Sequence, residues 1–284
     1  MKPVPGLITA ALFVAVLSSC VERIDINLDE SHTRLVVDGS FTTDTIRQKV
    51  ILTTTTSYYY NQPAPAVEGA DIEISDGTDV YDLREEAPGV YSTEYPVYGI
   101  PGRTYTLNIR LASQVGGYSE YTASAELFPV NRLDSLNLEY HPDWSDNGVW
   151  EVKCFVQDPP TNDYYRFRVS KNNRMLSDSL ADWFVTDDRF YNGNYAYGAP
   201  VAYLRQNTSE EILNPGDSVG VEMNSLSKEY AGFIWEAQAE VNGSNPLFSG
   251  PAANVRGNIS NGAIGFFAAY SISRAYIIVP GETK

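Results

Sequence analysis

Short runs in which hydrophobic and polar residues alternate dominate residues 34–127. Residues 70–75 alternate in this way before the turn dipeptide Asp76-Gly77, and residues 104–111 do so directly after Pro101-Gly102. Successive side chains of a strand point to opposite faces, so each run predicts a strand with one buried and one solvated face. The turn dipeptides between the runs favour antiparallel neighbours. The pattern predicts a small antiparallel β-sandwich over residues 34–128.

The rest of the chain shows the same alternation together with one helical pattern. Trp150, Val152, Cys154 and Val156 share one face of a predicted strand, which places Cys154 in a core. Apolar residues recur at helical spacing over residues 226–241, and Asn242-Gly243 is a typical helix stop. We therefore expect a larger antiparallel β-sandwich or barrel with one α-helix over residues 129–284.

The composition agrees with a mostly β protein and excludes one class of partner. The chain contains 20 Tyr, 21 Gly and 16 Pro, which favour strands and turns over helices. Its formal net charge of -16 repels the phosphate backbone of nucleic acids. We therefore expect no nucleic-acid partner.

The N-terminus carries an apolar run that ends next to a cysteine. Residues 7–17 are apolar except for Thr9, and this run is about half as long as a membrane-spanning helix. Lys2 before the run and small residues after it are typical of a signal peptide, predicted here over residues 1–19. Leu17-Ser18-Ser19-Cys20 resembles the lipobox of bacterial lipoproteins, which implies cleavage before Cys20 and lipid attachment to its sulfur. The alternative is an ordinary signal peptide. With a lipid on Cys20, residues 20–33 are expected to be an N-terminal tether.

Several longer stretches resemble one family. They are TRLVVDGSFTTD, TTTSYYYNQPAPAVEGADIEISDG, DDRFYNGN, NPGDSVGVEMNSLSKEY and ANVRGNISNGAIGFFAAYS. In this order after a lipobox, they look like outer-membrane lipoproteins of Bacteroidota grouped as domain-of-unknown-function family 4249. The resemblance implies an outer-membrane lipoprotein commonly encoded beside a TonB-dependent transporter, and it brings no reaction and no catalytic residues.

Two further features of the sequence bear on fold and location. Residues 67–109 resemble prealbumin-like sandwiches, which supports an Ig-like or prealbumin-like fold for the first domain. Export to the cell surface in Bacteroidota is associated with a dense acidic patch after the lipidated cysteine. The residues that follow Cys20 here are VERID, and only two of them, Glu22 and Asp25, are acidic. The sequence thus leaves open whether the protein faces the periplasm or the cell surface.

Motifs of catalysis and metal binding are missing from the sequence. The chain has no HExxH, CxxC, GxSxG, Walker or GxGxxG motif, and its two histidines, His32 and His141, are far apart. Residues 141–148 offer oxygen atoms for calcium but lack EF-hand spacing, and a polar turn is the alternative. We expect no metal, no cofactor and no enzymatic activity. A glycosidase-like enzyme with two suitably spaced carboxyl groups is the competing hypothesis.

Two aromatic clusters are candidate recognition sites. One is the tyrosine run at residues 58–60, and the other lies between residues 183 and 203 among Asp, Asn and Gly. Exposed Tyr and Trp can stack on sugars or anchor protein contacts, whereas core packing is the alternative use. The candidate ligand-binding residues are Trp183, Tyr191, Tyr195, Tyr197 and Tyr59.

These observations predict a non-catalytic lipoprotein anchored in the outer membrane. Its expected role is that of a binding or accessory component of a TonB-dependent transport system, with a glycan or peptide as ligand. The alternative is a carbohydrate-binding or adhesion module at the cell surface.

Overall fold

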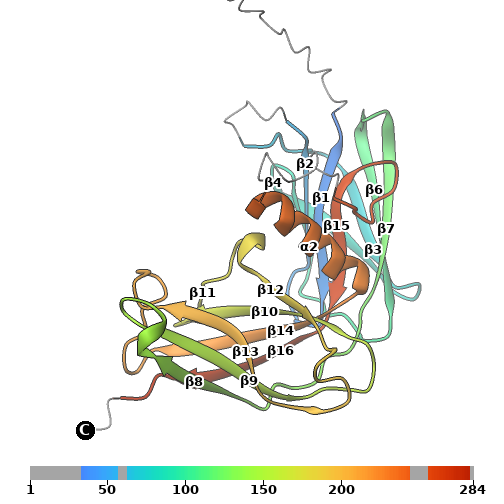
Figure 1. Cartoon of the computed structure of the whole chain (residues 1–284). Coiled ribbons are helices and arrows are strands. Elements are labelled where there is room, and N and C mark those ends of the chain that lie inside the picture. The colour runs from blue at the N-terminus through green and yellow to red at the C-terminus, as the bar shows by residue number, and fades with distance from the viewer. Residues whose placement is uncertain (1–32, 57–62, 244–254, 282–284) are drawn as a thin grey trace, which may run out of the picture. The chain divides into compact units, whose positions relative to one another are not determined.

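The computed structural model describes residues 33–56, 63–243 and 255–281. These residues form sixteen β-strands, one α-helix and two short 3₁₀ helices, which confirms the predicted mostly β fold (Figure 1). Within these ranges, no helix combines the length and the apolar character that crossing a membrane requires.

Eight strands form one sheet in the order β15-β1-β2-β5-β4-β3-β6-β7. Its buried side chains form a core that includes Phe41 stacked on Tyr105, with 4.3 Å between the ring centroids. Strand β15 also contacts β6 and β7, so the sheet curls until its two edges lie near each other. The predicted turn at Asp76-Gly77 connects β3 to β4. The strands are β1 (Leu35–Thr42), β2 (Lys49–Thr54), β3 (Asp71–Ser75), β4 (Val80–Ala87), β5 (Val90–Thr93), β6 (Thr104–Val115), β7 (Tyr118–Glu126) and β15 (Ile264–Tyr270).

Strand β15 reaches this sheet from far along the chain. It pairs in parallel with β1, and Gly265 lies opposite Val37. Gly265 has a φ of +100°, and a Cβ atom at this position would lie 1.9 Å from the carbonyl oxygen of Val37. A glycine is therefore required where the two backbones meet. The C-terminal part of the chain thus completes a sheet built otherwise from residues 35–126.

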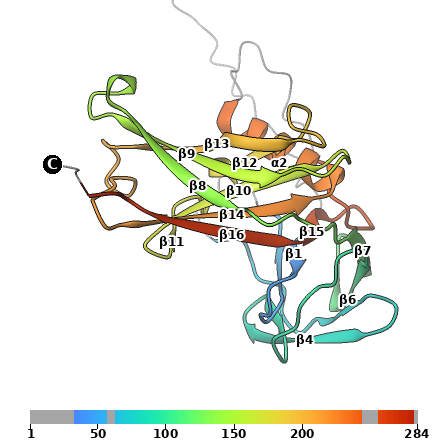
Figure 2. The ribbon, with the colours of Figure 1, turned by 90° about the horizontal axis from the view of Figure 1, so that it is seen from below.

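The remaining strands form two smaller sheets that share a core. The order is β11-β10-β14-β16, with β12 also paired to β10, in one sheet and β13-β9-β8 in the other. Side chains from both sheets, such as Cys154, Phe167 and Val221, form one buried cluster. Cys154 is only 1% exposed, as its place in the alternating pattern predicted. Figure 2 shows β16 running beside β8, which it contacts.

The bounds of these elements follow from the structure. The strands are β8 (Ser135–His141), β9 (Val149–Gln157), β10 (Tyr164–Lys171), β11 (Arg174–Met175), β12 (Phe184–Asp187), β13 (Tyr195–Arg205), β14 (Ser218–Leu226) and β16 (Ile272–Ile278). The 3₁₀ helices are η1 (Pro142–Trp144) and η2 (Leu180–Asp182).

The predicted helix is present as α2 (Lys228–Gly243). The hydroxyl of Ser227 accepts a hydrogen bond from the backbone N–H of Tyr230 at 3.1 Å and so caps its first turn. Ala231 and Ile234 are fully buried on the inner side of the helix. The helix contacts β10, β12 and β15, and Tyr230 lies 4.8 Å from the ring of Phe266 in β15. The helix therefore packs against strands of two different sheets.

Candidate functional site

One of the predicted binding residues, Trp183, packs inside the fold. Trp183 is half-buried, and its ring covers the guanidinium carbon of Arg166 at 4.3 Å. Arg166 itself is 2% exposed and lies 4.8 Å from the ring of Tyr270 on β15. Trp183 therefore packs against a buried cation inside the fold. Cys20 and Tyr59 lie outside the described residues.

The other predicted aromatic residues are accessible. Tyr191 is 37% exposed in the loop after β12. Tyr195 and Tyr197 lie on β13 with 4.6 Å between their ring centroids, and Tyr197 is 82% exposed. The hydroxyl of Tyr195 donates to the carboxylate of Asp134 at 2.9 Å. Tyr195 and Tyr197 thus form a pair of rings on one strand, in which Tyr195 is half-buried and Tyr197 is exposed.

Strand pairing extends this pair into a larger surface on the three-stranded sheet. Tyr197 lies opposite Phe155, and Tyr203 lies opposite Glu151, which in turn faces Glu139. The intervening residues of β9 point into the core, so these side chains share the outer side of the sheet. We call this surface, with the adjoining Trp144, the aromatic face. Its residues are Glu139, His141, Trp144, Glu151, Lys153, Phe155, Tyr195, Tyr197 and Tyr203.

One end of the aromatic face is a group of three rings. The imidazole of His141 stacks on the indole of Trp144 with 3.7 Å between ring centroids and 4° between planes. Trp144 lies 5.9 Å from Tyr203, and the two residues are 55% and 51% exposed. Residue 144 reaches this place because η1 follows directly after β8. Two exposed rings, inclined by 50° to each other, are thereby open to solvent beside polar groups.

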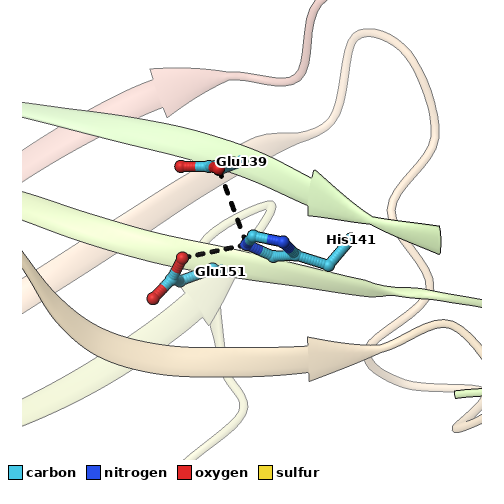
Figure 3. A group of neighbouring side chains, drawn as sticks. All are labelled: Glu139, His141 and Glu151. Atoms are coloured by element: carbon cyan, nitrogen blue, oxygen red, sulfur yellow. Dashed lines mark hydrogen bonds and ion pairs between the residues drawn. The ribbon is translucent and has the colours of Figure 1, made fainter. Parts of the chain in front are cut away.

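The imidazole of this stack also belongs to a charged group, and Figure 3 shows it between Glu139 and Glu151. The Nε2 atom of His141 is 2.9 Å from Oε2 of Glu151 and 3.9 Å from Oε1 of Glu139. The Nζ atom of Lys153 is 2.5 Å from Glu139 and 3.1 Å from Glu151. Burial raises the pKa of Glu151, but hydrogen bonds with His141 and Lys153 outweigh this effect, and the pKa is lowered overall. Burial and the Glu151 carboxylate raise the pKa of Tyr203.

The same group offers three ligand atoms that a metal could use. Atoms of Glu139, His141 and Glu151 all lie within 4.8 Å of one another. Lys153, however, contacts both carboxylates and supplies the positive charge that a metal would bring. The arrangement therefore fits hydrogen bonding to a polar ligand better than metal coordination. This group is not predicted from the sequence, although Glu139 and His141 stand two residues apart, as one strand face requires.

The geometry suits binding at a surface. The carboxylates of Glu139 and Glu151 both contact Lys153 and keep further lone pairs that can accept hydrogen bonds from a ligand. The exposed rings of Trp144, Tyr203 and Tyr197 offer apolar faces, and the charged groups between them offer donors and acceptors. Such a face can hold a ligand that is flat and apolar on one side and polar at its edges.

Comparisons with known proteins identify the family. The model of the family described as "Domain of unknown function (DUF4249)" matches residues 21–275, and the chain belongs to this family. The chain matches no curated protein. A solved structure described as "Cytokine receptor complex - Crystal form 1A" is 11% identical with a TM-score of 0.22, and the match covers 88% of this chain and 97% of that one.

Proposed function

We propose that this protein is a non-catalytic binding lipoprotein and that the aromatic face is its ligand-binding surface. The observation that carries the proposal is the exposed stack of Trp144 on His141 with Tyr203 beside it. Large rings usually become buried during folding, so 55% exposure of a Trp within a group of rings favours a contact with something else.

Carbohydrate is the ligand class that the chemistry of this face fits. A sugar ring has an apolar face of C–H groups that packs on an aromatic ring, and hydroxyls at its edge that need donors and acceptors. Glu139, Glu151 and Lys153 provide such partners next to Trp144 and Tyr203. Tyr197, further along β13, would extend the surface to a distant unit of a longer oligosaccharide.

A glycan array followed by calorimetric titration of the strongest hit tests the surface. Each of the variants Trp144→Ala, Tyr203→Ala and Tyr197→Ala is expected to weaken binding about tenfold, because one stacking contact is lost. Tyr95→Ala is the matched control, since Tyr95 is 69% exposed but belongs to the loop after β5. A silent array, or an equal loss in the control, contradicts the proposal.

The location and partner are a second part of the proposal. We propose a lipid anchor on Cys20 in the outer membrane of a Bacteroidota cell, next to a TonB-dependent transporter. Support comes from the apolar run at residues 7–17 and from the lipobox-like Leu17–Cys20 that follows it. Anchoring two proteins in one membrane raises their effective concentration, so that a weak contact between them is enough.

The lipid anchor and the transporter partner are tested by experiments that need no glycan ligand. Cys20→Ala is expected to move the protein from the membrane fraction to the soluble fraction, because about 0.8 kcal/mol per buried methylene is lost with the acyl chains. Crosslinking of the anchored protein in its own membrane, followed by mass spectrometry, should identify a transporter. Full retention of the Cys20→Ala variant in membranes would rule out the anchor.

A further inference from the structure

A cavity of about 280 Å³ opens between the two smaller sheets, on the side of β9 and β13 opposite the aromatic face. Its walls are apolar core residues, among them Cys154, Phe167, Val201 and Met223. These four side chains are each at most 6% exposed, so the cavity extends into the core itself. Its volume suits a small molecule and lies near the lower end of the range for ligand sites.

Aromatic side chains line the mouth of this cavity. Phe184 and Tyr191 are 44% and 37% exposed, and Phe190 is 85% exposed. Phe184 belongs to β12, and the other two belong to the loop that leads to β13. An apolar molecule that enters here would cover these rings and remove them from water, which favours binding.

The polar part of the cavity is negatively charged. Asp158 and Asp188 line it and are 4% and 5% exposed, and Asp163 lies next to them, with carboxylate oxygens of all three within 4.8 Å. Asp158 accepts hydrogen bonds from the hydroxyl of Tyr165 at 2.8 Å and from the backbone N–H of Gly193 at 3.2 Å.

These carboxylates lack a positive partner in the described part of the chain. Among those residues, no ion pair joins Asp158, Asp163 or Asp188 to a Lys, Arg or His. Burial raises the pKa of Asp158, and the charges of Asp188 and Asp163 add to this effect. Buried charges in proteins are usually paired, so a cation in the cavity would remove an unfavourable interaction.

We propose that this cavity binds a small amphipathic amine, with an aromatic or alkyl body between the sheets and an ammonium group beside Asp158 and Asp188. The apolar walls select the body, and the two buried carboxylates select the positive charge. A carboxylate of the same shape is repelled. A neutral alcohol of the same shape fits the walls but leaves the buried charges unpaired. The site is independent of the aromatic face, which lies on the other side of β9 and β13.

Three probes with the same ring test the charge preference on the unaltered mature domain. They are 2-phenylethylamine, 2-phenylethanol and phenylacetate, titrated by calorimetry at pH 7. We expect the amine to bind at least about tenfold more tightly than the alcohol and the carboxylate to give no saturable binding, since the buried ion pair is worth more than about 1.4 kcal/mol. Equal affinities of amine and alcohol overturn the proposal.

Variants locate the binding in the cavity. Ala199 is half-buried in the cavity wall, and Ala199→Phe should fill the space and reduce amine affinity at least tenfold. The double variant Asp158→Asn/Asp188→Asn should reduce amine affinity to that of the alcohol and leave alcohol binding unchanged, because both carboxylates at the cavity are then neutral. Asp82→Asn is the control, because Asp82 is an exposed carboxylate on β4.

Circular dichroism checks that each variant is folded. If a variant does not fold, the comparison of the three probes on the unaltered protein still decides the charge preference. Undiminished amine binding by a folded Ala199→Phe variant would also overturn the proposal. Loss of amine binding in the Asp82→Asn control to the same degree would do so as well.

Discussion

The imidazole of His141 lies parallel to the indole of Trp144, with 3.7 Å between ring centroids and 4° between planes. The contact joins the end of β8 to η1 and orients the indole beside Tyr203. We expect a double-mutant cycle with His141→Ala and Trp144→Ala to give a coupling of about 1 kcal/mol in the free energy of unfolding at pH 7. Urea unfolding of the four proteins measures it. A coupling near zero would mean that the stack does not hold the indole in place.

Acid should weaken the fold partly through Glu151. Its pKa is lowered in the folded protein from the ordinary value of 4.5. The folded state therefore binds fewer protons than the unfolded state below this value, so the stabilisation is present above pH 4.5 and is lost as the pH falls through the lowered pKa. Glu151→Gln should cost about 2 kcal/mol at pH 7 and progressively less below pH 4.5.

Urea unfolding at a series of pH values measures this difference. Glu120→Gln serves as the control, since the side chain of Glu120 is 74% exposed and its ion pair with Arg110 should contribute little. A difference between Glu151→Gln and the unaltered protein that does not change with pH would contradict the prediction.

Arg166 should not tolerate replacement by lysine. Its guanidinium lies between the rings of Trp183 and Tyr270, and its Nε donates to Oδ1 of Asn224 at 2.8 Å. A lysine ammonium has neither the planar group nor the Nε donor, so Arg166→Lys should destabilise the protein by about 3 kcal/mol. Thermal and urea unfolding check this value. Arg84→Lys is the control, because the side chain of Arg84 is 70% exposed, and a similar loss there would contradict the explanation.

Two glycines should respond to alanine with opposite signs. Gly265→Ala places a Cβ 1.9 Å from the carbonyl oxygen of Val37 at a φ of +100°, so it should destabilise the protein by at least about 3 kcal/mol by separating β15 from β1. Gly232→Ala lies in α2 with nothing within 4 Å of the new Cβ and should stabilise the helix by up to about 1 kcal/mol. Urea unfolding of both variants measures the difference. Equal effects would contradict the close approach of the two strands.

The thiol of Cys154 should be inert in the folded protein. Burial raises its pKa from 9.0 to about 12, so at pH 8 its thiolate fraction falls about a thousandfold, and only the thiolate is nucleophilic. Iodoacetamide should therefore modify Cys154 at least a thousandfold more slowly in buffer than in 6 M urea. Mass spectrometry of a Cys20→Ser variant follows this single thiol. Similar rates in the two solvents would contradict its burial.

Local pattern in the sequence determined the class of fold. The alternation at residues 70–75 and 104–111 predicted strands that are present as β3 and β6, and the helical spacing at 226–241 predicted α2. The alternation in β9 also placed Cys154 in the core. These predictions succeeded because the period of a side-chain pattern is fixed by the backbone geometry of the element itself.

The aromatic face was only partly visible in the sequence. Tyr195 and Tyr197 are predicted binding residues and lie on it, whereas Trp183 packs on Arg166, and His141 stands far from the other histidine of the sequence. Glu151 and His141 meet because β8 and β9 pair, and Trp144 meets Tyr203 across 59 residues of chain. Alternation tells which face of a strand a side chain occupies but not which strand becomes its neighbour.

Local patterns along the chain thus predict the elements, the buried faces and the acidic, mostly β character of this protein. Three features become visible only in the folded chain: β15 returns to pair with β1, Arg166 contacts the rings of Trp183 and Tyr270, and carboxylates gather at an apolar cavity. Such pairings depend on the packing of the whole sheet, in which many distant contacts form together.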